Sequence, residues 1–362
     1  MGFFINEITY ELKQHLNLSE KAWDTIYGDM RNFYGEEEKQ SFSGFLNRIF
    51  YNYYQEAEGS IGIRCNQLKE ELLSLSEQNR RAFSDSRATE KMISVIISKY
   101  ENELYSKAVS YPKGLGKKFR VNRQNLEILK DSDSSDYYDD SIGTYMKAVF
   151  EEYVTLSSAD RESVFFKDTI ESCNYAISQR KKIKISLQQR ISPKDGTTYA
   201  RRFYVAPYKV VSDKMNMFNY LIGISEEILS DGSLGEKRIS SFRISRIDKI
   251  SVMNSMSGFL SQQKIDEINK ELQKKPAQYM AGDLIDIEVV FTKKGLESFE
   301  RHIYLRPTDY KRIDTYSYIF TCTELQAIHY FFKFGKDAVI KSPVELNDKF
   351  RNYYKEALCA YE

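Results

Sequence analysis

The spacing of apolar residues predicts the elements at the start of the chain. Residues 8–13 alternate between apolar and polar side chains, which is the two-residue period of a β-strand. Ser19 is a suitable N-cap for a helix whose apolar stripe recurs every three to four residues until Gly35. A second stripe of the same spacing begins at Phe42 and ends near Gly59. Residues 1–62 are therefore predicted to form a strand followed by two helices.

This order of strand, helix and helix resembles a ribbon-helix-helix unit. In that family two chains pair their single strands into one ribbon, because one unit cannot bury its faces alone, so the resemblance implies a homodimer. It also places Thr9, Glu11 and Lys13 where such a ribbon reads DNA, which makes Thr9 and Lys13 candidate nucleic-acid contacts. The carboxylate of Glu11 opposes the approach of phosphate. Dimerisation is the predicted role of this segment, and DNA binding is the alternative.

Residues 63–140 are predicted to connect the first unit to the rest of the chain. The pattern is helical as far as about Val109, and Pro112 then ends the helix. The acidic stretch Asp131–Asp140 (DSDSSDYYDD) has too little apolar content to fold by itself. We therefore place the main linker there.

A basic segment precedes the acidic one. Lys117, Lys118, Arg120 and Arg123 are interleaved with Phe119, and such a run can follow a phosphate backbone by releasing counterions. The more frequent interpretation of such a run is a solvated linker. These four cations are therefore secondary nucleic-acid candidates.

The middle third, residues 141–260, is predicted to be mainly β-structure after a helical lead-in. Apolar and polar residues alternate in its first strand, and Asp195-Gly196 is a hairpin-type turn. The predicted strands cover residues 183–187, 199–211, 218–225, 239–244 and 247–252. Short strands of this kind suit a small closed or nearly closed β-barrel of the Sm or SH3-like type, which removes exposed edges.

Residues 261–362 are predicted to form a linker helix and a further α/β domain. After a helix from Gln262 to Lys275, the pattern reads strand, helix, strand, strand, helix, strand, with one extra helix. This is the order of a ferredoxin-like domain. Thr323 and Gln326 form a capping box at the start of its second helix. The whole chain is therefore predicted to be an α+β multidomain protein.

Composition narrows the classes of function. The 53 Lys and Arg nearly balance the 52 Asp and Glu, so a polyanion site depends on local clusters of cations. No apolar run reaches the roughly 20 residues of a membrane span, which predicts a cytoplasmic protein without membrane contact. The four cysteines are isolated and are interpreted as reduced and structural. Because no triad, metal-ligand or phosphate-loop motif is found, we expect a protein that is not an enzyme and uses no metal or cofactor.

Three segments of the middle third carry a family resemblance. They are Pro207-Tyr208, Asn219-Tyr220-Leu221 with Gly223, and Phe242-Arg243-Ile244-Ser245-Arg246-Ile247. In order and spacing they are similar to the WYL-domain family, which has a proline-aromatic pair, a Trp-Tyr-Leu triad with a following glycine, and a Phe-Arg-Leu-Asp-Arg-Ile run. Asn219 replaces the tryptophan and Ser245 the acidic residue, while Tyr220, Arg243 and Arg246 are kept.

Most members of that family are bacterial transcription regulators with a winged helix before the barrel. The ribbon-helix-helix pattern instead resembles the WYL-domain accessory proteins of type VI-D CRISPR systems, which bind single-stranded RNA and stimulate an RNA-guided ribonuclease. The resemblance implies the same two activities for this chain. The alternative is a transcriptional regulator that binds DNA through the ribbon and senses a nucleotide-like ligand on the barrel.

The residues kept from the family pattern indicate how RNA would be held. Arg243 and Arg246 are close in sequence, so their forked donors can converge on phosphate beside Tyr220, whose ring can stack on a base. An arginine on a strand is otherwise most often solvated or half of a surface ion pair. The further ligand candidates are Tyr208, Asn219, Ser186 and Arg190, and each of them has a purely structural role as its alternative.

Overall fold

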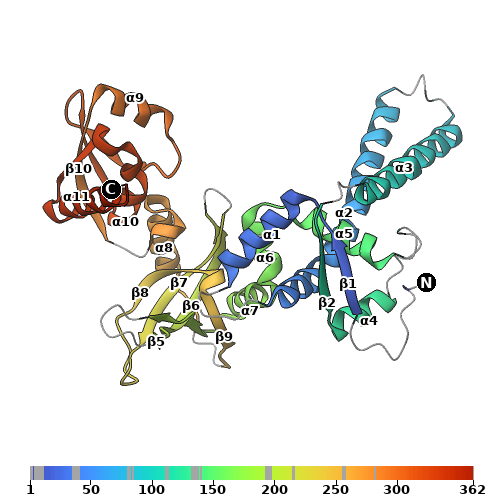
Figure 1. The fold of residues 1–362 in the computed structure, drawn as a ribbon, viewed down its shortest axis with the longest axis horizontal. Helices are drawn as coiled ribbons and strands as arrows, with labels where there is room; N and C mark the ends of the chain where they lie inside the picture. Colours follow the sequence, from blue (N-terminus) through green and yellow to red (C-terminus); the bar gives the residue numbers. More distant parts are fainter. Residues whose placement is uncertain are drawn as a thin grey trace. The chain divides into compact units, whose positions relative to one another are not determined.

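The computed structural model describes residues 3, 12–34, 41–79, 83, 85–110, 114–131, 138, 141–191, 198–213, 217–254, 258–280 and 283–361. Thr9, most of the acidic stretch and the Asp195-Gly196 turn lie outside the described residues. The fold combines helices with antiparallel sheets, and it divides into two compact units (Figure 1). The first unit comprises residues 1–170, 188–199 and 216–218, and the second comprises residues 171–187, 200–215 and 219–362. None of the helices in the described part of the chain is long and apolar enough to cross a membrane.

The elements of the first unit are β1 (Leu12–Asn17), α1 (Glu20–Phe33), α2 (Phe42–Gln78), α3 (Ser86–Val109), β2 (Gly116–Val121), α4 (Arg123–Asp131), α5 (Ile142–Tyr153), α6 (Ser158–Phe165), the start of α7 (Lys167–Ser178), β4 (Arg190–Ile191) and β5 (Thr198–Tyr199). The elements of the second unit, after the end of α7, are β3 (Ile183–Leu187), β6 (Arg202–Ser212), β7 (Asn219–Ile228), β8 (Arg238–Arg243), η2 (Ile244–Arg246), β9 (Ile247–Val252), α8 (Gln262–Lys274), η3 (Ala277–Tyr279), β10 (Leu284–Phe291), α9 (Lys293–Arg301), β11 (Tyr310–Arg312), β12 (Ser317–Thr323), α10 (Glu324–Phe331), η4 (Phe332–Asp337), β13 (Ala338–Ser342) and α11 (Val344–Cys359).

The strand near the start of the chain pairs within the same chain. β1 runs antiparallel to β2, from Leu12 opposite Val121 to Asn17 opposite Gly116 (Figure 1). The basic segment predicted to be linker is therefore mostly strand, because Phe119 and Val121 are buried on its inner side. The described part of the first strand is therefore not the unpaired strand that the ribbon-helix-helix resemblance implies, because β2 of the same chain pairs with one of its edges. The homodimer predicted from it has lost that support and stays a prediction.

Two helices after this strand were predicted, and the second is longer than expected. Ser19 Oγ accepts a hydrogen bond from the Ala22 backbone N–H at 3.2 Å, which confirms the N-cap of α1. α2 passes through Gly59 and spans the 37 residues from Phe42 to Gln78, and α3 packs beside it (Figure 1). A glycine inside a helix costs only about 1 kcal/mol. Burial of Ile61 and Cys65, one turn apart, offsets that cost.

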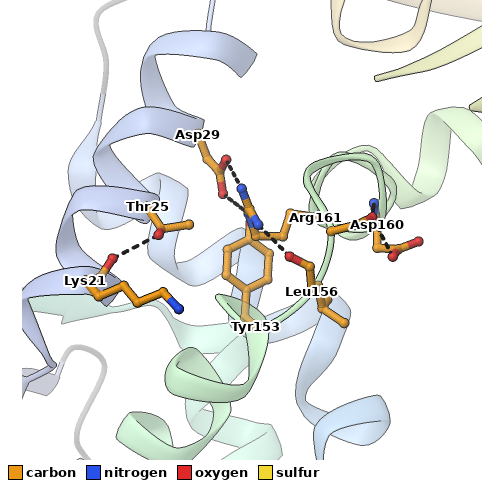
Figure 2. Close-up of polar contacts among 8 residues, drawn as sticks. Lys21, Thr25, Asp29, Tyr153, Leu156, Asp160 and Arg161 are labelled. Carbon is orange, nitrogen blue, oxygen red and sulfur yellow. Dashed lines mark hydrogen bonds and ion pairs between the residues drawn. The ribbon is translucent and has the colours of Figure 1, made fainter. Parts of the chain in front are cut away.

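A buried ion pair joins three helices of the first unit (Figure 2). The Asp29 side chain on α1 accepts hydrogen bonds from Arg161 Nε on α6, at 2.7 Å, and from the Tyr153 hydroxyl on α5, at 2.9 Å. Burial raises the pKa of the Asp29 carboxyl, while Arg161 and Tyr153 act in the opposite direction. Asp29 is only 2% exposed, so it depends on these partners for the hydrogen bonds that water would otherwise supply.

The predicted strands of the middle third form one open sheet. The strands pair in the order β8-β7-β6-β3-β9, all antiparallel. β8 and β9, which a barrel would have to pair, lie at opposite edges, so the described strands do not close into the predicted barrel. One face buries Ile183, Ile185 and Phe203. The other face is covered in part by α8 and η3, which contribute Ile268, Ala277 and Met280 to a second apolar cluster.

The C-terminal part of the second unit follows the predicted element order. β10, α9, β11, β12, α10 and β13 occur in that sequence, followed by α11, and the strands pair in the order β11-β12-β10-β13. Thr323 Oγ1 accepts from the Gln326 backbone N–H at 3.3 Å, as its capping role requires. The core between this sheet and its helices is rich in aromatic rings, including Phe291, Phe320 and Phe331.

Candidate nucleic-acid interface

The structure brings together two of the three residues kept from the family pattern. Tyr220 on β7 and Arg243 on β8 are direct cross-strand partners, so their side chains share one face, with Cβ atoms about 5 Å apart. Both are half-buried, and Arg243 Nε donates to Ser245 Oγ at 2.7 Å. Arg246 lies at the end of η2 and is exposed. An aromatic ring and an arginine are therefore adjacent, with a second arginine three residues further along.

The other candidates on β6 and β7 mainly support the sheet. Tyr208 and Tyr220 pack against the apolar cluster beneath α8, and the Tyr208 hydroxyl donates to Asn269 Oδ1 at 3.3 Å. Asn219 is 5% exposed and accepts a hydrogen bond from Ser212 Oγ at 2.8 Å. Asn219 is therefore buried away from any polyanion on the surface. The two tyrosine rings are only partly accessible to a ligand.

A second set of polar residues lies on the same face of the sheet, outside the part that α8 covers. Strand pairing sets Lys184 opposite both Tyr204 and Ser251, and it sets Ser186 opposite both Arg202 and Lys249. Side chains that are directly opposite in neighbouring strands point to the same face. We call this group the basic strand face; its members are Lys184, Ser186, Arg202, Tyr204, Lys249 and Ser251.

The basic strand face combines exposed cations with an aromatic ring. Arg202 and Lys249 are exposed, while Tyr204 is half-buried, with the Lys184 Nζ 6.0 Å from its ring centroid. The neighbouring carboxylate of Glu226 is paired with Lys182 at 3.3 Å. Glu226 lies directly opposite Tyr204 on β7, and Lys184 lies on the other side of the ring, on β3. The cations of this face outnumber that carboxylate, so the field beside the ring, on which a base can stack, is positive.

Sequence reasoning found Ser186 of this group and missed its cations. Lys184 alternates with buried isoleucines along its strand. That pattern does not show which strands pair, so it does not place Arg202 and Lys249 beside Lys184. Arg190 lies on β4, which pairs with β5, and its side chain is outside the described part of the chain.

The predicted cations of the first unit separate into two groups. Lys117 points inward, where its ammonium donates to the Tyr27 hydroxyl and lies 4.0 Å from the Tyr27 ring centroid and 5.0 Å from that of Trp23. This cation–π contact gives Lys117 a structural role. Lys13, Lys118, Arg120 and Arg123 are exposed.

The described residues contain neither a reactive buried cysteine nor a cluster of metal ligands. Cys65, Cys173 and Cys322 are buried, and burial raises the pKa of Cys173 and of Cys322 to about 12. Cys359 is exposed, so the prediction that all four cysteines are structural does not extend to it. Within the described ranges, no group of three His, Cys, Asp or Glu side chains could hold a metal ion.

Comparison with known proteins gives an extensive structural similarity. A solved structure described as a CRISPR Cas-related protein matches with a TM-score of 0.73 at 24% identity, covering 99% of this chain and 96% of that one. The two proteins therefore share a fold over almost their whole lengths. Proteasome accessory factor B/C (PafBC) of Arthrobacter aurescens matches with a TM-score of 0.30 at 12% identity, over 62% of this chain and 32% of that one, which is too low to inform the fold. No protein-family model matches the chain. No curated protein sequence matches it either.

Proposed function

We propose that this chain is a non-catalytic, single-stranded-RNA-binding protein that stimulates an RNA-guided CRISPR ribonuclease. The observation that carries the proposal is the basic strand face, on which Lys184, Arg202 and Lys249 share one side of the sheet with Tyr204. The CRISPR setting is supported by the shared fold with a protein described as CRISPR Cas-related and by the resemblance to the type VI-D accessory proteins.

The arrangement of the basic strand face favours a single strand over a duplex. Bases of a single strand can stack on a tyrosine while lysine and arginine contact the phosphates. In a duplex the faces of the bases are already stacked on one another, so stacking on Tyr204 would contribute nothing to binding. The hydroxyls of Ser186 and Ser251 lie on the same face, and each can donate to or accept from the 2′-OH that distinguishes RNA from DNA.

Substitutions of Tyr204 test this function. Tyr204→Ala is expected to weaken binding of a single-stranded RNA oligonucleotide about 5- to 150-fold, because stacking contributes roughly 1–3 kcal/mol per base. Tyr204→Phe keeps the ring and should bind within about twofold of the unaltered protein, since a phenyl ring stacks as well. Fluorescence anisotropy with a labelled oligonucleotide measures both, and thermal unfolding confirms that both variants are folded.

The same two variants connect binding to stimulation. The unaltered protein and Tyr204→Phe should raise the cleavage rate of the RNA-guided ribonuclease, and Tyr204→Ala should raise it less. Equal stimulation by both variants, or equal loss of RNA binding in both, would contradict the proposal. RNA cleavage by the purified protein alone would contradict its non-catalytic part.

The second candidate function is a transcriptional regulator that binds duplex DNA. The observation in its favour is the β1–β2 ribbon, because a two-stranded ribbon fits the major groove and the outer side of this ribbon carries Lys13, Lys118 and Arg120. A nucleotide-like effector would then bind near Tyr220 and Arg243.

A further inference from the structure

The first unit contains a groove of about 770 Å³ between the start of α2 and the segment joining β2 to α4. Its lining includes Arg48 on α2, Arg120 at the end of β2 and Arg123 at the start of α4. Tyr51 and the carboxylate of Asp168 also line it. Because the lining has three cations and one carboxylate, the groove favours an anionic ligand.

The cation from α2 is held in place by aromatic rings. The guanidinium carbon of Arg48 lies 4.5 Å from the centroid of Phe165 and 5.6 Å from that of Phe166. A guanidinium stacked on a ring keeps its N–H donors in the plane, where they can contact phosphate. Arg48 is therefore oriented before any ligand arrives.

The cations of β2 and α4 are fixed against α2 by buried amides. Asn47 Nδ2 donates to the Arg120 carbonyl at 2.7 Å, and Asn47 Oδ1 accepts from the Asn122 backbone N–H and from Asn125 Nδ2, both at 2.9 Å. Asn122 Oδ1 accepts from the Asn125 backbone N–H at 3.0 Å, as an N-cap of α4 does. This network keeps the walls of the groove at a constant separation.

The positive charge continues from the groove onto the ribbon. Arg120 is opposite Lys13, and Lys118 is opposite His15, so these residues share the outer side of β1 and β2. All four are exposed. Arg120 therefore belongs both to the outer side of the ribbon and to the groove.

We infer that the groove and the ribbon together bind a stretch of single-stranded nucleic acid. Arg48, Arg120 and Arg123 hold successive phosphates, and Tyr51, which is 44% exposed, stacks on a base. A small anion would use only the groove and leave Lys13 and Lys118 unused, whereas a strand with one charge per nucleotide uses both. This site adds to the basic strand face and does not depend on RNA binding there.

The double substitution Arg120→Glu with Arg123→Glu tests the site. Arg123 is the first residue of α4, where an acidic side chain stabilises a helix, and both side chains are exposed, so the variant is expected to fold. The matched control is Lys69→Glu with Lys91→Glu on α2 and α3, which changes the charge equally at exposed positions. Binding of labelled oligouridine RNA to the full chain is measured by anisotropy over a range of salt concentrations.

The groove variant is expected to bind at least tenfold more weakly than the control. Its slope of log affinity against log salt should be shallower by about 1.4, which corresponds to two lost contacts at roughly 0.7 each. Tyr51→Ala should lose about 5- to 150-fold, while Tyr51→Phe should retain binding. Equal weakening of the groove variant and the control would overturn the site. So would duplex DNA that binds more tightly than the RNA and loses as much affinity in the groove variant.

The two RNA proposals are separated by one further comparison. The groove variant is repeated in a protein that carries Lys184→Ala, Arg202→Ala and Lys249→Ala. If the groove substitutions remove the residual binding there, the groove inference holds. If the triple substitution alone changes nothing while the groove variant loses binding, the groove inference holds and the basic strand face fails. If the groove substitutions have no effect in either background, the groove inference is wrong.

Discussion

Asp29→Ala is expected to lower the free energy of unfolding of the first unit by about 3–5 kcal/mol, the usual cost of removing one partner of a buried ion pair. Arg161 has a side chain that is only 14% exposed, and it would keep the Leu156 carbonyl but lose the carboxylate that neutralises it (Figure 2). The Tyr153 hydroxyl, which is buried, would lose its acceptor as well.

The single tryptophan of the sequence makes this loss measurable in the first unit alone. Trp23 is 4% exposed on α1, so its fluorescence during urea denaturation reports the unfolding of that unit. The control is Thr25→Ala, which removes a hydroxyl that donates to the Lys21 carbonyl of the same helix and should change stability by less than about 0.5 kcal/mol. Similar values for the two variants would contradict the structural role of the ion pair.

The second large effect concerns RNA. Substituting Lys184, Arg202 and Lys249 together with alanine is expected to weaken single-stranded RNA binding on the order of 100-fold near 0.1 M salt, because three phosphate contacts are lost. The slope of log affinity against log salt should become shallower by about 2, at roughly 0.7 for each contact.

The matched control removes the same charge elsewhere in the second unit. Lys293, Lys311 and Lys341 are exposed on α9, β11 and β13, so their triple alanine variant tests the effect of net charge alone. The control should stay within about twofold of the unaltered protein, since distant surface charges are screened at this salt concentration. If both triple variants weaken binding equally, the contacts do not lie on the basic strand face.

The sequence predicted the elements of the second unit better than it predicted their arrangement. Each strand of the open sheet was located from the sequence, and in β3 the signal was period-two alternation, because Ile183 and Ile185 are buried on one face. Alternation along one strand does not show which other strands pair with it. Lys184, Arg202 and Lys249 are far apart in the chain, and only the pairing of β3 with both β6 and β9 brings them together. The same limitation led to the prediction of a closed or nearly closed barrel.

Long-range pairing also explains the errors in the first unit. The sequence predicts that the first strand pairs with a second chain, because its actual partner, β2, follows two long helices and lies in the basic segment interpreted as linker. Lys117 was counted with Lys118 and Arg120, although alternation along β2 turns it toward Trp23. Arg48 was not identified, because a single arginine on a helix has no distinguishing pattern until Phe165 and the groove surround it.

A competition experiment tests the central claim, that this chain binds single-stranded RNA. Labelled single-stranded RNA bound to the full chain is challenged with unlabelled single-stranded RNA, duplex RNA and duplex DNA of matched sequence at equal nucleotide concentration. Single-stranded RNA is expected to displace the label at concentrations at least tenfold lower than either duplex. Displacement by duplex DNA at an equal or lower concentration would contradict the account and would support the DNA-binding regulator instead.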